Sequence, residues 1–398
     1  MRADHERRVV DAVTATMFVH GIGASAVLPM LPLFLKQQHT GTTMIGAVIA
    51  SYFVAGVLTQ YASGYLTDRA GHRRVVIGGL TVYAVASAGF LLSFGAAGYL
   101  VLRGLQGLGA GALTVACLAL VGVVVPVERR GRAFSRVFAA QLGGMAIGPT
   151  IGSIVGTAHI RWLFVLTSAA AVLATVPIAW GAPAHTVGRD ETPTALVVSR
   201  GLVGVLLVSV AGGVIGGAYE SCWSLLMASR GAHVWQVGLS WTLFAIPFAA
   251  ISPLAGRLVD RHDRRPLAIG ALLASAGFAV TYPFLPTPTL LIGLGVFESV
   301  AVAIAFPAAQ SLLTETAGAD ALGRAQGMFT TAETAAIAVA AAISGYLFSV
   351  ARWLPFIVMA AIATAIAVAL PRLWRDVPGH ARRDTDVAQR APATISAI

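Results

Sequence analysis

Long apolar segments with almost no charge recur along the sequence, and no other feature restricts the fold as strongly. Each segment holds roughly 20 residues, which is enough for an α-helix to cross about 30 Å of hydrocarbon. Only 11% of the 398 residues are charged, whereas a soluble protein has about 25%. The short alternating segments of a membrane β-barrel are absent from the sequence. We therefore predict an all-α membrane protein with twelve transmembrane helices, over residues 9–35, 43–66, 75–95, 98–121, 134–157, 161–181, 200–228, 236–258, 267–285, 289–313, 325–349 and 353–374.

Basic residues are distributed unevenly between the two sides that twelve spans define. With a cytoplasmic N terminus, only Lys36, Arg161, Arg230 and Arg352 face outward, Arg103 lies within a span, and the other 22 of the 27 face the cytoplasm. Cytoplasmic loops of membrane proteins carry such an excess. The basic start MRADHERR precedes no convincing cleavage site, so we expect it to be retained. We expect a multi-pass protein of a bacterial-type inner membrane with both termini cytoplasmic, and the net charge of +10 requires no nucleic-acid partner.

The chain contains an internal repeat. Residues 64–74, GYLTDRAGHRR, and 256–266, GRLVDRHDRRP, share five residues at an offset of 192 positions, and further short tracts recur at that offset. We predict a six-helix half over 1–180, a polar cytoplasmic linker over 181–199, a second six-helix half over 200–374 and a disordered cytoplasmic tail over 375–398. Paired halves with a substrate site between them are one of the arrangements that secondary transporters use.

The repeated charged stretch suits a turn between two helices. Its glycine, Gly64 or Gly256, would let the helix end approach a neighbour, and Asp68 or Asp260 could lie against a helix N terminus and pair with the arginines. The pattern resembles the signature loop of the major facilitator superfamily, which is thought to stabilise one of the alternating conformations. The second copy has Asp263 at the position of Gly71, so we expect it to matter less. The candidate conformational residues are Gly64, Asp68, Arg69, Gly71, Arg73, Asp260 and Arg261.

The fourth span contains Arg103, with Gln106 one turn further on. An arginine in hydrocarbon costs about 3 kcal/mol on insertion scales, so it must face a cavity or a partner, unless it reaches the outer surface. The sequence RGLQGLGA resembles the fourth-helix motif of the same superfamily, in which the arginine is associated with proton coupling. The resemblance implies the same association for Arg103.

The fifth span reads GGMAIGPTIGS, with Gly144, Gly148, Pro149 and Gly152. Small residues four apart let helix backbones touch, and a proline bends a helix. The pattern resembles the fifth-helix motif associated with antiporters, and the second half lacks it, which argues for more than shared architecture. In the first span, LPMLPLFL is similar to a segment of the twelve-helix drug:proton antiporters.

Three acids lie deep in spans of the second half, at Glu220, Glu298 and Glu333, and His20 lies midway along the first span. Burial in hydrocarbon favours the neutral form of a carboxyl group, which a proton carrier needs, although a structural partner could also neutralise it. Histidine titrates near neutral pH but is as often a packing residue. We expect Glu220 or Glu298 to carry a coupling proton with Arg103 across the cavity. The other cavity candidates are Gln106, Tyr219 and Trp223.

These features predict a proton-coupled secondary transporter of the major facilitator type, most similar to an antiporter in multidrug efflux that exports small amphipathic molecules. The alternatives are a transporter of a defined metabolite, such as a sugar or an amino-acid-like solute, and a non-transporting membrane sensor or enzyme. The sequence has no Walker loop, HExxH, CxxC or GxSxG motif, so we expect no enzyme, no metal and no cofactor. The expected partners are a small molecule, protons and the lipid bilayer, and we expect a monomer.

The charge asymmetry makes the topology testable. Reporter fusions at either terminus, or within 181–199, should report a cytoplasmic location, because moving the basic loops across the membrane is unfavourable. A fusion after Arg161 serves as the outward-facing control. An extracytoplasmic signal from either terminus would contradict the predicted topology.

Overall fold

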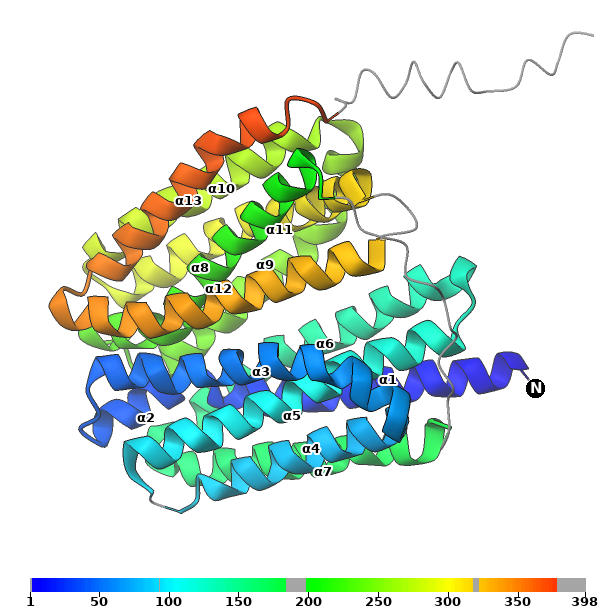
Figure 1. Ribbon diagram of the computed structural model, residues 1–398. Coiled ribbons are helices and arrows are strands. Elements are labelled where there is room, and N and C mark those ends of the chain that lie inside the picture. The colour runs from blue at the N-terminus through cyan, green and yellow to red at the C-terminus, as the bar shows by residue number, and fades with distance from the viewer. Residues whose placement is uncertain (1, 93, 184–197, 318–321, 378–398) are drawn as a thin grey trace, which may run out of the picture.

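The computed structural model describes residues 2–92, 94–183, 198–317 and 322–377 (Figure 1). For residues 2, 3, 61, 63–65, 68, 127 and 128 it describes the backbone alone. Most of the predicted linker, 184–197, and most of the predicted tail, 378–398, lie outside the described residues.

The fold is all-α, as predicted, and twelve long helices make up the described part of the chain. Eleven segments are long and apolar enough to cross a membrane, and α4, which begins with a histidine and two arginines, completes the set. The helices are α1 (Arg2–Val27), α3 (Thr42–Ala70), α4 (His72–Gly89), α5 (Gly95–Val124), α6 (Val127–Val155), α7 (Ile160–Gly181), α8 (Arg200–Ser229), α9 (Val234–Arg261), α10 (Arg264–Thr281), α11 (Pro288–Ala317), α12 (Leu322–Val350) and α13 (Leu354–Leu373). The short α2 (Leu31–Gln37), η1 (Thr157–His159) and η2 (Tyr282–Phe284) lie between them.

The first predicted span, 9–35, is two helices rather than one. α1 ends at Val27, residues 28–30 form a turn, and α2 begins at Leu31. Pro29 and Pro32 cause this break, because proline has no N–H to donate to the preceding turn and its ring clashes with a continuing helix. The segment LPMLPLFL therefore contains the break between α1 and α2, within the candidate span Asp4–Gln37.

The internal repeat is present in the helix bounds. α4 and α10 begin 192 residues apart and end 192 residues apart, and α3 and α9 also begin 192 residues apart. Burial follows the same spacing along α5 and α11: the equivalent buried residues are Tyr99, Arg103, Gln106 and Gly107 on α5, and Leu291, Gly295, Glu298 and Ser299 on α11. Positions 192 apart can therefore be compared as structural equivalents.

The two copies of the charged stretch turn the chain in different ways. In the first copy α3 continues to Ala70, and Gly71 alone makes the turn with φ of 83°, a left-handed conformation that favours glycine. In the second copy Asp263 caps α10, because its carboxylate accepts a hydrogen bond from the backbone N–H of Arg265 at 3.0 Å. The Arg265 guanidinium donates to the same carboxylate. The N-cap of α10 is therefore Asp263 and not Asp260, which is exposed.

The glycine of the second copy does not serve the close approach expected of it. A Cβ atom added to Gly256 would meet open space among the described residues, so no neighbouring backbone requires glycine there. The side chain of Asp68 lies outside the described part, and its role in the first copy stays a prediction.

Helices α1–α7 and α8–α13 form two groups in Figure 1. The groups meet at the end of the bundle opposite the N terminus, here called the far end, and diverge toward the end that carries the N terminus, the near end (Figure 1). The far-end contacts are backbone to backbone. A Cβ on Gly46 of α3 would lie 2.5 Å from the Ala341 carbonyl oxygen of α12, and a Cβ on Gly238 of α9 would lie 2.5 Å from the Pro149 carbonyl oxygen of α6. These two contacts are equivalent under the 192-residue offset.

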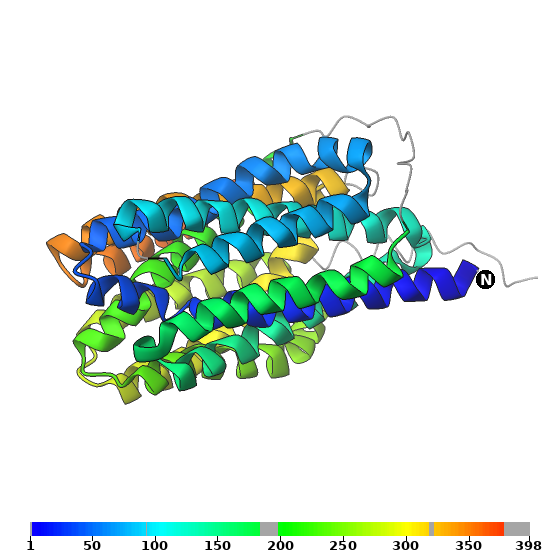
Figure 2. The same ribbon diagram turned by 90° about the horizontal axis from the view of Figure 1, so that it is seen from below.

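Small residues also join helices within each group. Figure 2 shows that α1 runs beside α7 in the first group. The other side of α1 packs on α6, where Cβ atoms at Gly144, Gly148 and Gly152 would clash with the α1 backbone. The second group makes the same contact with glycines on the partner helix: Gly213 and Gly217 of α8 lie against the α12 backbone. The absence of a glycine motif from α12 therefore does not mean the absence of close packing there.

We predict that Asp68→Asn impairs transport while membrane insertion and expression stay near wild type, and that Asp260→Asn is milder. The physical reason is that Asp68 belongs to the copy with the glycine turn, whereas Asp260 is exposed and replaced as a cap by Asp263. Uptake into inverted membrane vesicles, normalised to protein amount, measures both. Full activity of both variants would remove the charged stretch from the mechanism.

The far-end contact gives a second prediction. Gly345→Leu should separate α3 from α12, because Gly345 lies against the Thr42 carbonyl and the Cα of Gly46, and overpacking costs about 1–3 kcal/mol. Spin labels on the exposed residues Thr43 and Ser349 should move apart, and transport should fall. Gly327→Leu on the same helix is the control, since that position faces open space. Equal label distances in both variants would contradict a far-end contact at Gly345.

Candidate functional site

The buried Arg103 of α5 is held by a short chain of hydrogen bonds inside the first group. Its Nη1 donates to Oε1 of Gln106 at 2.8 Å, and Nε2 of Gln106 donates to Oγ of Ser87 on α4 at 2.9 Å. Arg103 is 4% exposed, so its charge is withdrawn from solvent in the described structure. The guanidinium is thus oriented by neutral partners that do not cancel its charge.

Two further side chains lie near this guanidinium, one from each half. The Arg103 Cζ lies 4.4 Å from the centroid of the Tyr52 ring on α3, a favourable cation–π geometry. Glu220 of α8 is half-buried and lies within Coulombic reach of both Arg103 and Tyr52. The described residues include no direct ion pair between Arg103 and Glu220, so the two charges interact across a separation. Arg103 and Glu220 are therefore opposite charges that belong to different halves.

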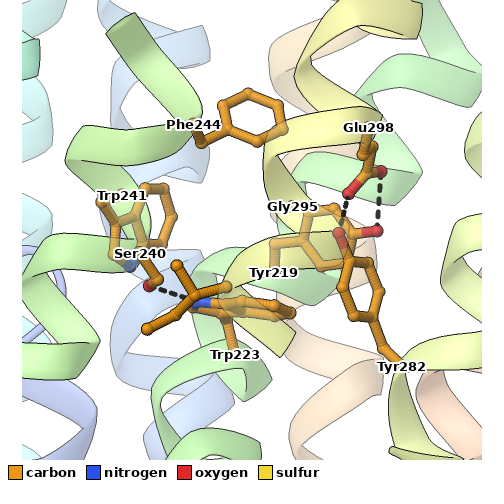
Figure 3. Close-up of a pocket in the computed structure, with 9 residues that line it drawn as sticks. Tyr219, Trp223, Ser240, Trp241, Phe244, Tyr282, Gly295 and Glu298 are labelled. Carbon is orange, nitrogen blue, oxygen red and sulfur yellow. Dashed lines mark hydrogen bonds between the residues drawn. The ribbon is translucent and has the colours of Figure 1, made fainter. Parts of the chain in front are cut away.

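A second buried acid, Glu298 of α11, lies in a pocket of the second group (Figure 3). Its Oε1 accepts a hydrogen bond from the Tyr219 hydroxyl at 2.8 Å, and its Oε2 accepts one from the Tyr282 hydroxyl at 2.6 Å. Glu298 is 2% exposed. No basic side chain among the described residues forms a hydrogen bond or an ion pair with it.

Aromatic side chains form most of the remaining pocket wall. The Trp223 and Tyr282 rings meet edge to face with centroids 4.8 Å apart, and Nε1 of Trp223 donates to Oγ of Ser240 at 2.9 Å, which fixes the indole. Trp241 and Phe244 of α9 line the opposite side (Figure 3). The cavity that these side chains enclose measures about 70 Å³.

The other predicted residues lie apart from these two clusters. His20 of α1 packs edge to face on Tyr83, with ring centroids 4.7 Å apart, and its Nδ1 has no hydrogen-bond partner among the described residues. Glu333 of α12 faces the α8 backbone near Gly212. The structure therefore brings Arg103 near Glu220, places Tyr219 and Trp223 with Glu298, and leaves Glu333 outside both sets.

Sequence reasoning missed several polar and aromatic residues of these clusters. Single tyrosines, serines and phenylalanines in apolar spans carry no motif, so their positions gave no signal on their own. The internal repeat relates two of them, because Phe244 stands 192 residues after Tyr52. The missed residues are Tyr52, Tyr83, Ser87, Ser240, Trp241, Phe244 and Tyr282.

Comparisons with known proteins agree with the helical architecture. Residues 13–219 and 201–397 each match the Major Facilitator Superfamily. A class E tetracycline resistance protein of Escherichia coli is 24% identical over 377 residues, which cover 87% of this chain and 89% of that protein. Multidrug resistance protein 2 of Bacillus subtilis (strain 168) is 26% identical over 173 residues, which cover 44% of this chain and 43% of that protein.

Solved structures match over nearly the whole chain. The nucleoside transporter NupG superposes with a TM-score of 0.75 at 12% identity, over 92% of this chain and 99% of that one. The peptide transporter POT in complex with sulfate also gives 0.75, at 14% identity, over 92% and 95%. At such identities the likeness shows the fold alone. The fold is that of a multi-pass helical membrane transporter built from two six-helix groups. The chain belongs to the major facilitator superfamily.

Proposed function

We propose that this protein is a proton-coupled antiporter that exports small amphipathic molecules by alternating access. The observation that carries the proposal is the position of Glu220, a half-buried acid of one half within Coulombic reach of the buried Arg103 of the other half. A carboxyl group that faces Arg103 in one conformation and water in another would release and bind a proton in turn. Exchange of a proton for a substrate requires this alternation.

The arrangement of the halves supports an alternating mechanism. The halves touch through Gly46 and Gly238 at the far end and diverge toward the near end (Figure 1). We place the near end in the cytoplasm because the described turns at that end carry most of the basic residues, among them Arg69, Arg73, Arg129, Arg261 and Arg264. In the proposed cycle this is the inward-facing state, and export requires the far-end contacts to separate while the near end closes.

The proposed direction and substrate class rest on the relatives and on the fifth-helix motif. The relatives include a multidrug resistance protein and a tetracycline resistance protein, whose names refer to drugs. The sequence from Gly144 to Gly152 resembles an antiporter motif, and in the structure its Pro149 carbonyl meets Gly238 of the other half. A substitution in this motif would therefore directly alter the contact between the two halves.

We predict that Glu220→Gln abolishes substrate accumulation driven by a pH gradient, because glutamine cannot bind and release a proton, while substrate exchange without a gradient continues. Inverted membrane vesicles with a panel of fluorescent amphipathic compounds, ethidium among them, measure both activities. Glu333→Gln is the matched control, since Glu333 also lies within a span but outside the Arg103 cluster. Unchanged accumulation and pH dependence in Glu220→Gln would contradict the proposed role.

A further inference from the structure

The pocket around Glu298 and the cluster around Arg103 occupy equivalent places in the two halves. Under the 192-residue offset, Tyr52 corresponds to Phe244, Arg103 to Gly295 and Gln106 to Glu298. The burial pattern supports this register, because Arg103 and Gln106 are buried on α5 at the positions where Gly295 and Glu298 are buried on α11. Each half therefore contains an aromatic ring from one helix and a hydrogen-bond acceptor from another.

In the first half, the side chain of Arg103 fills the space between these two groups. Its guanidinium lies over the Tyr52 ring at 4.4 Å and donates to Oε1 of Gln106 at 2.8 Å. In the second half, Gly295 has no side chain to fill the equivalent space, and a pocket is present there. Figure 3 shows Phe244 and Trp241 on one side of this pocket and Glu298 with its two tyrosines on the other.

The charges of the two places are complementary. The first half holds a cation with a neutral acceptor, Gln106. The second half has an acidic acceptor, Glu298, whose two oxygens accept hydrogen bonds from Tyr219 and Tyr282 and whose charge no basic side chain among the described residues balances. Burial favours the protonated form of a carboxyl group that has no cationic partner, and a bound cation would favour the carboxylate instead.

We infer that the pocket lined by Phe244, Gly295 and Glu298 binds an organic guanidinium or ammonium cation with an apolar body. The cationic group takes the position that the Arg103 guanidinium has in the other half, over the Phe244 ring and hydrogen-bonded to Glu298. The apolar body packs on the aromatic side chains of Trp223 and Trp241. The inference deepens the proposed function by naming the substrate class, and it assigns Glu298 to the substrate and Glu220 to the proton.

Benzylguanidinium and benzylurea test the inference, because they have nearly the same shape and differ by one positive charge. Isothermal titration calorimetry on the full chain purified in detergent, at neutral pH and without any gradient, should show benzylguanidinium binding about tenfold or more tightly than benzylurea, as a charge-assisted contact implies. Glu298→Gln should remove this preference and Glu298→Asp should retain part of it. Equal affinity of the wild type for the two compounds would overturn the inference.

Substitution of the glycine tests the location of the site independently. Gly295→Leu should abolish binding of both compounds, because its side chain enters the space that Arg103 fills in the other half. Gly293→Leu on the same helix is the matched control, since Gly293 is exposed and faces open space among the described residues. Undiminished binding in Gly295→Leu would place the site elsewhere and overturn the inference.

Failure of the proposed transport function gives a different pattern. If the protein binds benzylguanidinium as described but shows no proton-driven accumulation, the cation site stands and the antiport proposal fails. If accumulation depends on Glu220 but no cation preference exists, the antiport proposal stands and the assignment of Glu298 fails. The calorimetric measurement needs no gradient, so the two results are independent.

Discussion

The arrangement of the two halves depends on the close approach of four helices at the far end. Gly46 meets Ala341 and Gly238 meets Pro149, each backbone against backbone. Interior apolar surface gives little driving force for association in lipid, so such van der Waals contact between small residues is what holds helices together. The two contacts are copies of one another, and both hold the halves together at the far end. These contacts fix the relative position of the halves, and with it the separation of Arg103 and Glu220.

Buried charge is the second constraint. Arg103 is withdrawn from solvent. Its Nη1 donates to Gln106, which in turn donates to Ser87, and its guanidinium lies over the Tyr52 ring, so its contacts leave the charge in place. Across the halves, Glu220 supplies a negative charge within Coulombic reach. Separated charges of opposite sign can respond when one of them meets water or a proton, because no direct ion pair has to be broken first. The separation therefore suits a part of the structure that has to move.

The sequence predicts the fold because hydrocarbon imposes a length and a composition on every span. Nine of the twelve long helices begin and end within four residues of the predicted bounds, whereas α4 ends six residues before its predicted end and α6 begins seven residues before its predicted start. The first was placed as one helix where Pro29 and Pro32 divide it. The charged positions within spans were also recognisable, since a charge in hydrocarbon is rare enough to stand out. The aromatic residues Tyr52, Tyr282 and Trp241 carry no such signal in the sequence. Aromatic residues are common in spans, and only tertiary packing shows which of them line a polar cluster. The sequence also did not predict that Asp263 caps α10, since either aspartate of that turn could have done so.

Duplication offers a physical account of how one scaffold comes to hold two kinds of polar site. The same two helix positions carry an arginine with a glutamine in the first half and a glycine with a glutamate in the second. The pair of exchanges removes the positive charge and opens the space that its side chain fills, while an aromatic ring and a hydrogen-bond acceptor remain on either side. The first site thereby holds a fixed positive charge within Coulombic reach of Glu220, and the second becomes a pocket beside an acid that has no basic partner among the described residues. Divergence of this kind requires no change in helix packing, because the far-end contacts of α3 and α9 remain equivalent in the two halves.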